Sequence, residues 1–479
     1  MASKTTLNAT NLEALGAARL AELLIEVSTG SAAAKRKLRL ALAGAQGPDD
    51  AARAIGKRLT SIARARSSLS WQSRKTLVDD LEMQRRAIIE QVAPAEPREA
   101  LALLWRFMGL ADSVLDRCHD SGGTVIGVFH AGCRSLGDAA RAANPPTRDL
   151  AEAVCQALQG NSYGQYDGLV EIMAPALGAE GLVHLKALVE ELGRTPLPVP
   201  PEDKWQAFGW GRDGPIYVHV MREAERQRTV SMALQDIADA QGDVDGFIAQ
   251  YDTATRGMPL IAVEIARRLL AAGRAEEALS SIEGVEFETG EWIPDEWQNA
   301  RLAVLEALGR KEEAQSFRWT CFEQDLSVEH LRAFLKRLPD FEDFSAEERA
   351  MAHAMAHPDV LDALQFFLGW PALGRAASLL TARHAELDGD HYEYLVPAAE
   401  ALAERYPLAA TLALRAMVDF TLSAARSSRY GHAAQHLATC AALAADIADF
   451  GALEEHDAYV ARLKREHGRK YGFWSHVGY

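Results

Sequence analysis

The chain has 479 residues, of which 48% are hydrophobic and 25% are charged, and its formal net charge is -16. This composition is typical of a folded protein, so it argues against global disorder and against a surface that binds nucleic acid over its whole extent. The five cysteines are scattered without a C-x-x-C pair, which argues against a disulfide framework and favours a reducing cytoplasm. We also expect no signal peptide and no membrane span, because no stretch approaches about 18 uninterrupted apolar residues.

Helical periodicity dominates the first part of the chain. Apolar residues recur at helical spacing from Leu12 onward and predict two short helices on either side of Ser28 to Ser31. No segment shows the period-two alternation of strands bounded by hairpin turns. Residues 1–194 therefore predict a helical N-terminal domain, whose further helices are expected at about 49–66, 71–92, 97–118, 124–143, 148–159, 166–177 and 179–193.

Residues 34–86 are strongly basic, with 13 Lys or Arg against five acidic residues. A basic face of this kind can bind the phosphates of DNA or RNA. The alternatives are a solvated basic face, or one that docks onto the acidic repeats of this chain or of a second copy, because no aromatic stacking platform is evident. The candidate nucleic-acid-binding residues are Lys35, Arg36, Lys37, Arg39, Lys57, Arg58, Arg64 and Arg66.

Two polar segments between predicted helices resemble binding loops but lack the residues that such loops need. Asp116 to Gly123 has no Walker lysine and no preceding strand, so we expect Asp120 or Ser121 to cap the helix that begins near Thr124. Residues 161–168 fail the EF-hand pattern and predict a tight turn between helices.

Four of the 18 prolines lie within Thr195 to Pro201, which predicts an extended segment. Together with the Gly- and Trp-containing residues that follow, it forms a predicted linker over residues 195–215. Residues 216–479 are then expected to form a second domain.

A repeated motif indicates the architecture of this second domain. Residues 269–279 are echoed at residues 305–315, with seven of eleven positions identical. Gly242, Gly273 and Gly309 are spaced by 31 and 36 residues, near the period of about 34 found in tetratricopeptide (TPR) hairpins. Each glycine suits the left-handed conformation that ends a helix, and a small alanine follows where the paired helices approach. The sequence therefore predicts an all-α protein, with a helical N-terminal domain followed by a TPR-like α-solenoid.

Histidine pairs occur on two of the helices predicted beyond residue 345, which we place at about 346–357, 361–368, 372–387, 392–405, 409–427, 432–446 and 453–467. His432 and His436 have the i, i+4 spacing that lets two imidazoles bind one metal ion. Cys440 lies about 12 Å along the helix from His432 and is not expected to join them. A structural role at a helix interface is the alternative. His353 and His357 lack the glutamate of a zinc protease motif, and we expect Asp359 to cap the helix that follows them.

Segments 12–24, 115–123, 331–339 and 467–474 together resemble a bacterial family of unknown function. Its helical-repeat region is similar to the region found beside SWIM zinc fingers. The resemblance implies an all-helical repeat fold and no catalytic residues. A SWIM finger needs C-x-C followed by C-x-H, and this chain has neither, so the role of the finger is not implied here.

Three functions remain open from the sequence. The first is a cytoplasmic, non-catalytic scaffold whose helical surface binds a protein or peptide partner. The second is a nucleic-acid-associated factor that uses residues 35–86. The third is a metal-assisted enzyme built around His432 and His436. No cofactor is expected, and the oligomeric state stays open.

Overall fold

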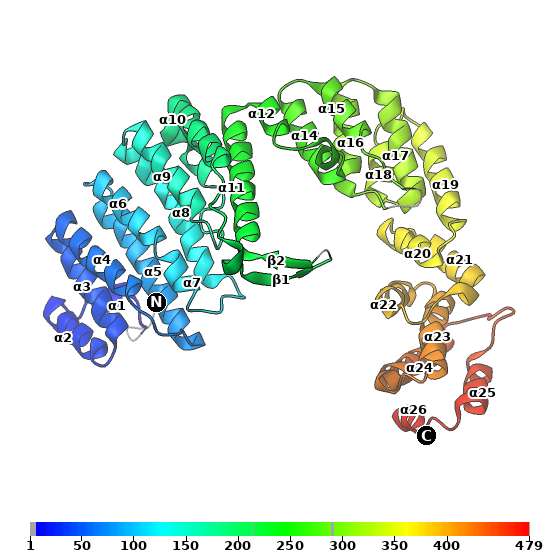
Figure 1. Ribbon diagram of the computed structural model, residues 1–479. Coiled ribbons are helices and arrows are strands. Elements are labelled where there is room, and N and C mark those ends of the chain that lie inside the picture. The colour runs from blue at the N-terminus through cyan, green and yellow to red at the C-terminus, as the bar shows by residue number, and fades with distance from the viewer. Residues whose placement is uncertain (1–5, 213, 289–291, 479) are drawn as a thin grey trace. The chain divides into compact units, whose positions relative to one another are not determined.

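The computed structural model describes residues 6–212, 214–288 and 292–478, and the secondary structure of this part is almost entirely helical (Figure 1). The chain divides into two compact units, Met1–Arg256 and Gly257–Tyr479. The all-α class predicted from the sequence is therefore confirmed. The two units are described in turn.

The first unit contains thirteen α-helices and one strand pair in its described residues. They are α1 (Ala9–Glu13), α2 (Ala17–Ser28), α3 (Ala32–Gln46), α4 (Pro48–Ala63), α5 (Trp71–Ala87) with a π-helical end (Ile88–Val92), α6 (Pro97–Met108), α7 (Ala111–Leu115), α8 (Thr124–Ala143), α9 (Thr147–Gln159), α10 (Leu169–Arg194), β1 (Ala207–Gly211), β2 (Gly214–Tyr217), α11 (Val218–Gln241), α12 (Val244–Ile248) and α13 (Thr253–Arg256).

Helix α8 lies in the core of this unit. Local contacts explain where it begins and how closely it packs against α10. The Asp120 carboxylate accepts the backbone amides of Val125 and Ile126 at 3.0 and 2.9 Å, so the predicted cap is confirmed. On its buried face, a Cβ added at Gly137 would lie 2.7 Å from the carbonyl oxygen of Ile172. The missing side chain thus lets α8 approach the backbone of α10 closely.

Helix α10 occupies the region where two helices were predicted. A break at Gly178, with a φ of 59°, separates its two halves. The helix is long and apolar enough to cross a membrane by composition alone, but it packs against α8, α9 and α11.

The predicted linker holds a β-hairpin that the sequence reading did not anticipate. Strands β1 and β2 pair antiparallel, with Gly209 opposite Ile216 and Trp210 opposite Pro215. Phe208 and Trp210 are 68% and 81% exposed. The following helix, α11, packs against α10 and belongs to the first compact unit, which ends at Arg256.

The helices of the second unit are α14 (Pro259–Ala271), α15 (Ala275–Glu283), α16 (Asp295–Ala307), α17 (Lys311–Asp325), α18 (Val328–Leu335), α19 (Glu342–Met355), α20 (Val360–Gly369), α21 (Leu373–Arg383), α22 (Tyr392–Leu402), α23 (Pro407–Ser423), α24 (Tyr430–Ala444), α25 (His456–His467) and α26 (Tyr471–Val477).

The repeated motif forms the turns of two successive helical hairpins, α14–α15 and α16–α17. Gly273 and Gly309 have φ values of 74° and 71°, the left-handed conformation predicted for them. In each turn the amide of the next residue reaches back to a helix carbonyl, at 2.8 Å from Arg274 and 2.9 Å from Arg310. Ala278 and Ala314, which follow the two turns, are buried where the paired helices meet. The repeated residues therefore have structural roles, as expected.

Two hydrophobic clusters stabilise the rest of the second unit. One gathers Phe322, Phe367 and Leu395 with other side chains of α17 to α24. The other joins α23 and α24 to the C-terminal helices through Phe473 and Trp474.

Candidate functional site

A cleft of about 620 Å³ in the second unit combines an apolar lining with polar groups. Helix α23 packs against both α22 and α24 and lines the cleft with Leu414 and Met417. Val396 of α22 and Leu443 of α24 extend the apolar lining. We call this feature the His cleft, because α24 also contributes His432 and His436 to it.

The two histidines lie on one face of α24, as their spacing predicts. His432 is exposed and His436 is half-buried, and neither ring forms a hydrogen bond within the described residues. Burial lowers the pKa of His436, and the positive charge of His432 lowers it further. His436 is therefore held as a neutral imidazole to lower pH than an exposed histidine.

The arrangement around this pair bears on the metal hypothesis. Across the described ranges, no group of three or more His, Cys, Asp or Glu side chains is placed to hold a metal ion. Cys440 is fully buried, its Sγ lies 3.9 Å from the carbonyl oxygen of Thr411, and burial raises its pKa to about 12. Helix α24 thus supplies two imidazoles, whereas a zinc site takes at least three protein ligands.

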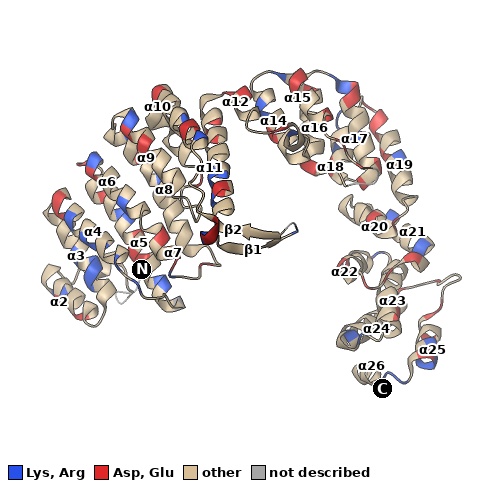
Figure 2. Ribbon diagram, in the orientation of Figure 1, with Lys and Arg blue, Asp and Glu red and all other residues tan. Residues whose placement is uncertain are grey.

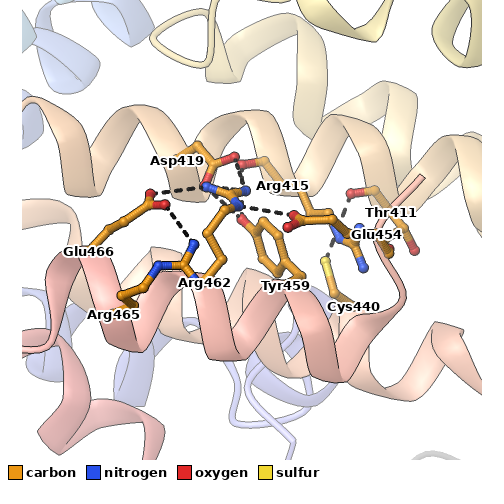
Figure 3. Close-up of polar contacts among 9 residues, drawn as sticks. All are labelled: Thr411, Arg415, Asp419, Cys440, Glu454, Tyr459, Arg462, Arg465 and Glu466. Atoms are coloured by element: carbon orange, nitrogen blue, oxygen red, sulfur yellow. Dashed lines mark hydrogen bonds and ion pairs between the residues drawn. The ribbon is translucent and has the colours of Figure 1, made fainter. Parts of the chain in front are cut away.

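A second polar cluster lies between α23 and α25 (Figure 3). Arg462 donates to Asp419 Oδ2 at 3.1 Å and to Glu454 Oε2 at 2.9 Å. The Tyr459 hydroxyl donates to Asp419 Oδ1 at 3.1 Å. One arginine therefore pairs with both carboxylates, and it also pairs with Glu466.

Arg415 lies beside this network and is only 6% exposed. Its Nη1 donates to the Glu454 carbonyl at 2.7 Å, and its guanidinium carbon lies 4.3 Å from the centre of the Tyr459 ring. Its Nε and Nη2 have no hydrogen-bond partner in the described structure. Burial lowers the pKa of Arg415. With Asp419, Tyr459 and Arg462 it lines a cleft of about 600 Å³, which we call the Arg415 cleft.

The predicted basic face carries both signs of charge where the structure describes it (Figure 2). Asp80 is 4% exposed, and both Arg36 and Arg58 form ion pairs with it, at 3.3 and 2.5 Å. The side-chain amide of Gln84 also donates to this carboxylate, at 3.1 Å. Arg36 and Arg58 therefore hold α3, α4 and α5 together.

The other six candidate residues are exposed and form no ion pair within the described part of the chain; they are Lys35, Lys37, Arg39, Lys57, Arg64 and Arg66. Lys57 and Arg64 line a shallow cleft of about 890 Å³ between α4 and α6 that also contains Glu96 and Glu99. This part of the surface is therefore mixed in charge and not uniformly positive.

Comparison with known families identifies the chain only at the level of its family. A model described as "Family of unknown function (DUF6880)" matches residues 2–476. The chain belongs to this family. No curated protein matches it.

In this member of the family, the residues of the Arg415 cleft were not singled out by sequence reasoning. Arg415 and Asp419 occupy ordinary polar positions in a predicted helix, and their partners lie about 40 residues away in α25 and the preceding loop. One feature of the sequence could have pointed to Arg415. Between Pro407 and Val418 the sequence contains a single charged residue, Arg415, within an otherwise apolar run.

Proposed function

We propose that this protein is a cytoplasmic, non-catalytic scaffold with a TPR-like helical-repeat second unit, and that its His cleft binds a helical segment of a partner protein. The observation that carries the proposal is the His cleft itself, which lies alongside three helices and combines an apolar lining with polar groups. The two successive helical hairpins of α14 to α17 support the repeat architecture, as does the resemblance to helical regions beside SWIM fingers. All five cysteines are free, which suits a reducing compartment.

The dimensions of the His cleft favour a helical ligand. Its lining extends along α22 from Tyr392 to Ala403, the residue that caps the helix, and along α24 from His432 to Leu443. Eleven helical steps correspond to roughly 16 Å, or about three turns. A partner helix of that length presents apolar side chains at positions i, i+4 and i+7 on one face, which matches a groove with an apolar lining and polar edges.

A displayed library of amphipathic helical peptides tests this proposal directly. Selection on the full-length protein should enrich peptides with apolar residues at the i, i+4 and i+7 positions. Thr439→Arg places a long cation in the His cleft from an exposed position, so it should weaken binding of the enriched peptides by about tenfold or more. Ala438→Arg is the matched control, because Ala438 is exposed on the same helix but does not line the cleft.

Two outcomes would contradict the proposal. One is enrichment of peptides that bind both arginine variants equally well, which would place the binding surface elsewhere. The other is the absence of any helical pattern among the enriched peptides.

The exposed cations of α3 and α4 favour a second candidate function, binding of nucleic acid. Fluorescence anisotropy with single- and double-stranded oligonucleotides tests it, because phosphate binding weakens steeply between 50 and 200 mM salt. A triple substitution of Lys35, Lys37 and Arg39 by glutamate should abolish such binding. Salt-independent or unaltered binding would exclude the candidate.

A further inference from the structure

We propose that the Arg415 cleft is a binding site for the carboxylate group of a small ligand, recognised by the unpaired edge of the Arg415 guanidinium. This cleft shares only Gly389 with the lining of the His cleft, and Arg415 does not line the His cleft, so either proposal can fail without the other.

Arg415 carries a positive charge in a buried position. A guanidinium stays protonated in proteins, and a buried charge normally has an ionic partner or a full set of hydrogen bonds. Within the described residues Arg415 has no ion pair, and its single hydrogen bond goes to a backbone carbonyl. The Tyr459 and Phe450 rings, 4.3 and 5.7 Å from its guanidinium carbon, stabilise the charge only in part.

The neighbouring carboxylates, Asp419 and Glu454, act on the charge of Arg415, but neither accepts a hydrogen bond from its guanidinium. Asp419 and Glu454 line the same cleft, but the side chain of each accepts hydrogen bonds from Arg462. Asp419 also accepts the Tyr459 hydroxyl. Figure 3 shows both acids in contact with Arg462, and neither of their side chains accepts a hydrogen bond from Arg415.

The position of the unpaired atoms favours a carboxylate in particular. Nε–H and one Nη2–H point from the same edge of the planar guanidinium, and this edge matches the two oxygens of a carboxylate. Both nitrogens are buried and unpaired. The Thr411 hydroxyl, one turn earlier on α23, and His456 Nδ1, at the start of α25, are buried and unpaired as well. Neither of these two residues lines the cleft, so the unpaired donors at the cleft are those of Arg415.

Calorimetric titration of the full-length protein tests the proposal. Acetate, succinate and 2-oxoglutarate serve as carboxylate probes, inorganic phosphate represents the alternative anion, and chloride at matched ionic strength is the blank. We expect at least one carboxylate to bind saturably at one site. Arg415→Lys keeps the charge but loses the two-donor edge, so it should weaken that binding by roughly tenfold or more.

Arg405→Lys is the matched control, because Arg405 is exposed in the same unit and lines neither cleft; it should leave the affinity unchanged. If Arg415→Lys does not fold, Ala452→Trp replaces it, since Ala452 is an exposed loop residue that lines the Arg415 cleft and a bulky side chain there should block entry. Binding of phosphate alone, equal losses in Arg405→Lys, unaltered binding in Ala452→Trp, or no saturable binding of any carboxylate would overturn the proposal.

Discussion

At the scale of single residues, the range over which a side chain acts decides whether its role can be read from the sequence. Asp120 and Asp359 cap helices that begin within a few residues of them, and both roles were predicted; Asp359 accepts the amides of Leu361 and Asp362 at 2.7 and 3.3 Å. Asp80 pairs instead with Arg58, 22 residues away, and with Arg36 on another helix. The residues next to Asp80 in the sequence do not indicate that it pairs with these two arginines.

The His432 and His436 pair leads to a prediction about pH. Burial and the charge of His432 lower the pKa of His436 in the folded protein, whereas an unfolded chain titrates near about 6.5. Between the lowered pKa and about 6.5 the unfolded state binds more protons, so acidification through this window should reduce the free energy of unfolding. Below the lowered pKa this residue causes no further loss.

Imidazole NMR titration measures this directly, and His436 should protonate at lower pH in the folded protein than in the unfolded chain. His436→Gln should remove its share of the acid destabilisation. Protonation of His436 in the folded protein at or above about pH 6.5 would contradict the expectation.

At the scale of elements, helices were easier to predict than the hairpin. Glycines with positive φ mark helix ends at Gly242, Gly273 and Gly309, and this conformation is a local property of the chain. The β1–β2 hairpin is a different case. Its strands are short, glycine interrupts their alternation, and exposed Phe208 and Trp210 do not follow the buried-and-exposed pattern that identifies strands in a sequence.

The turn glycines support a prediction about stability. A Cβ at Gly309 would meet no atom within 4 Å, so Gly309→Ala should destabilise the second unit through its φ of 71° alone, by about 1 kcal/mol. Gly431→Ala is the control: Gly431 lies in α24 with ordinary φ and equally open space, so alanine there should be neutral or stabilising by up to about 1 kcal/mol. Urea unfolding followed by circular dichroism measures both. Similar effects of the two substitutions would show that φ is not the cause.

At the scale of the whole molecule, the hydrophobic cores follow the two compact units. The largest described cluster contains residues from Leu40 to Ile237. Two further clusters lie between Phe322 and Trp474. Each unit therefore has apolar contacts sufficient for cooperative unfolding of its own.

We accordingly expect scanning calorimetry to resolve two unfolding transitions. Asp120→Ala removes the cap of α8 and should lower the midpoint of one transition, consistent with a loss of about 1 kcal/mol. Gly309→Ala should lower the midpoint of the other. Ser121→Ala is the control for the first variant, since Ser121 is exposed and does not cap α8. A single transition that both variants shift would mean that the units unfold together.

The sequence by itself determined the all-helical class, most helix positions, the caps at Asp120 and Asp359 and the turns of the repeated hairpins. These features depend on backbone conformation and on contacts within a few residues, which local patterns encode. Only the tertiary structure decided that Arg36 and Arg58 pair with Asp80, that the helices of the second unit enclose the His cleft, and that Arg415 is buried with one edge unpaired. These outcomes depend on which distant side chains meet when helices pack, and a helical pattern specifies which face is buried but not what lies against it.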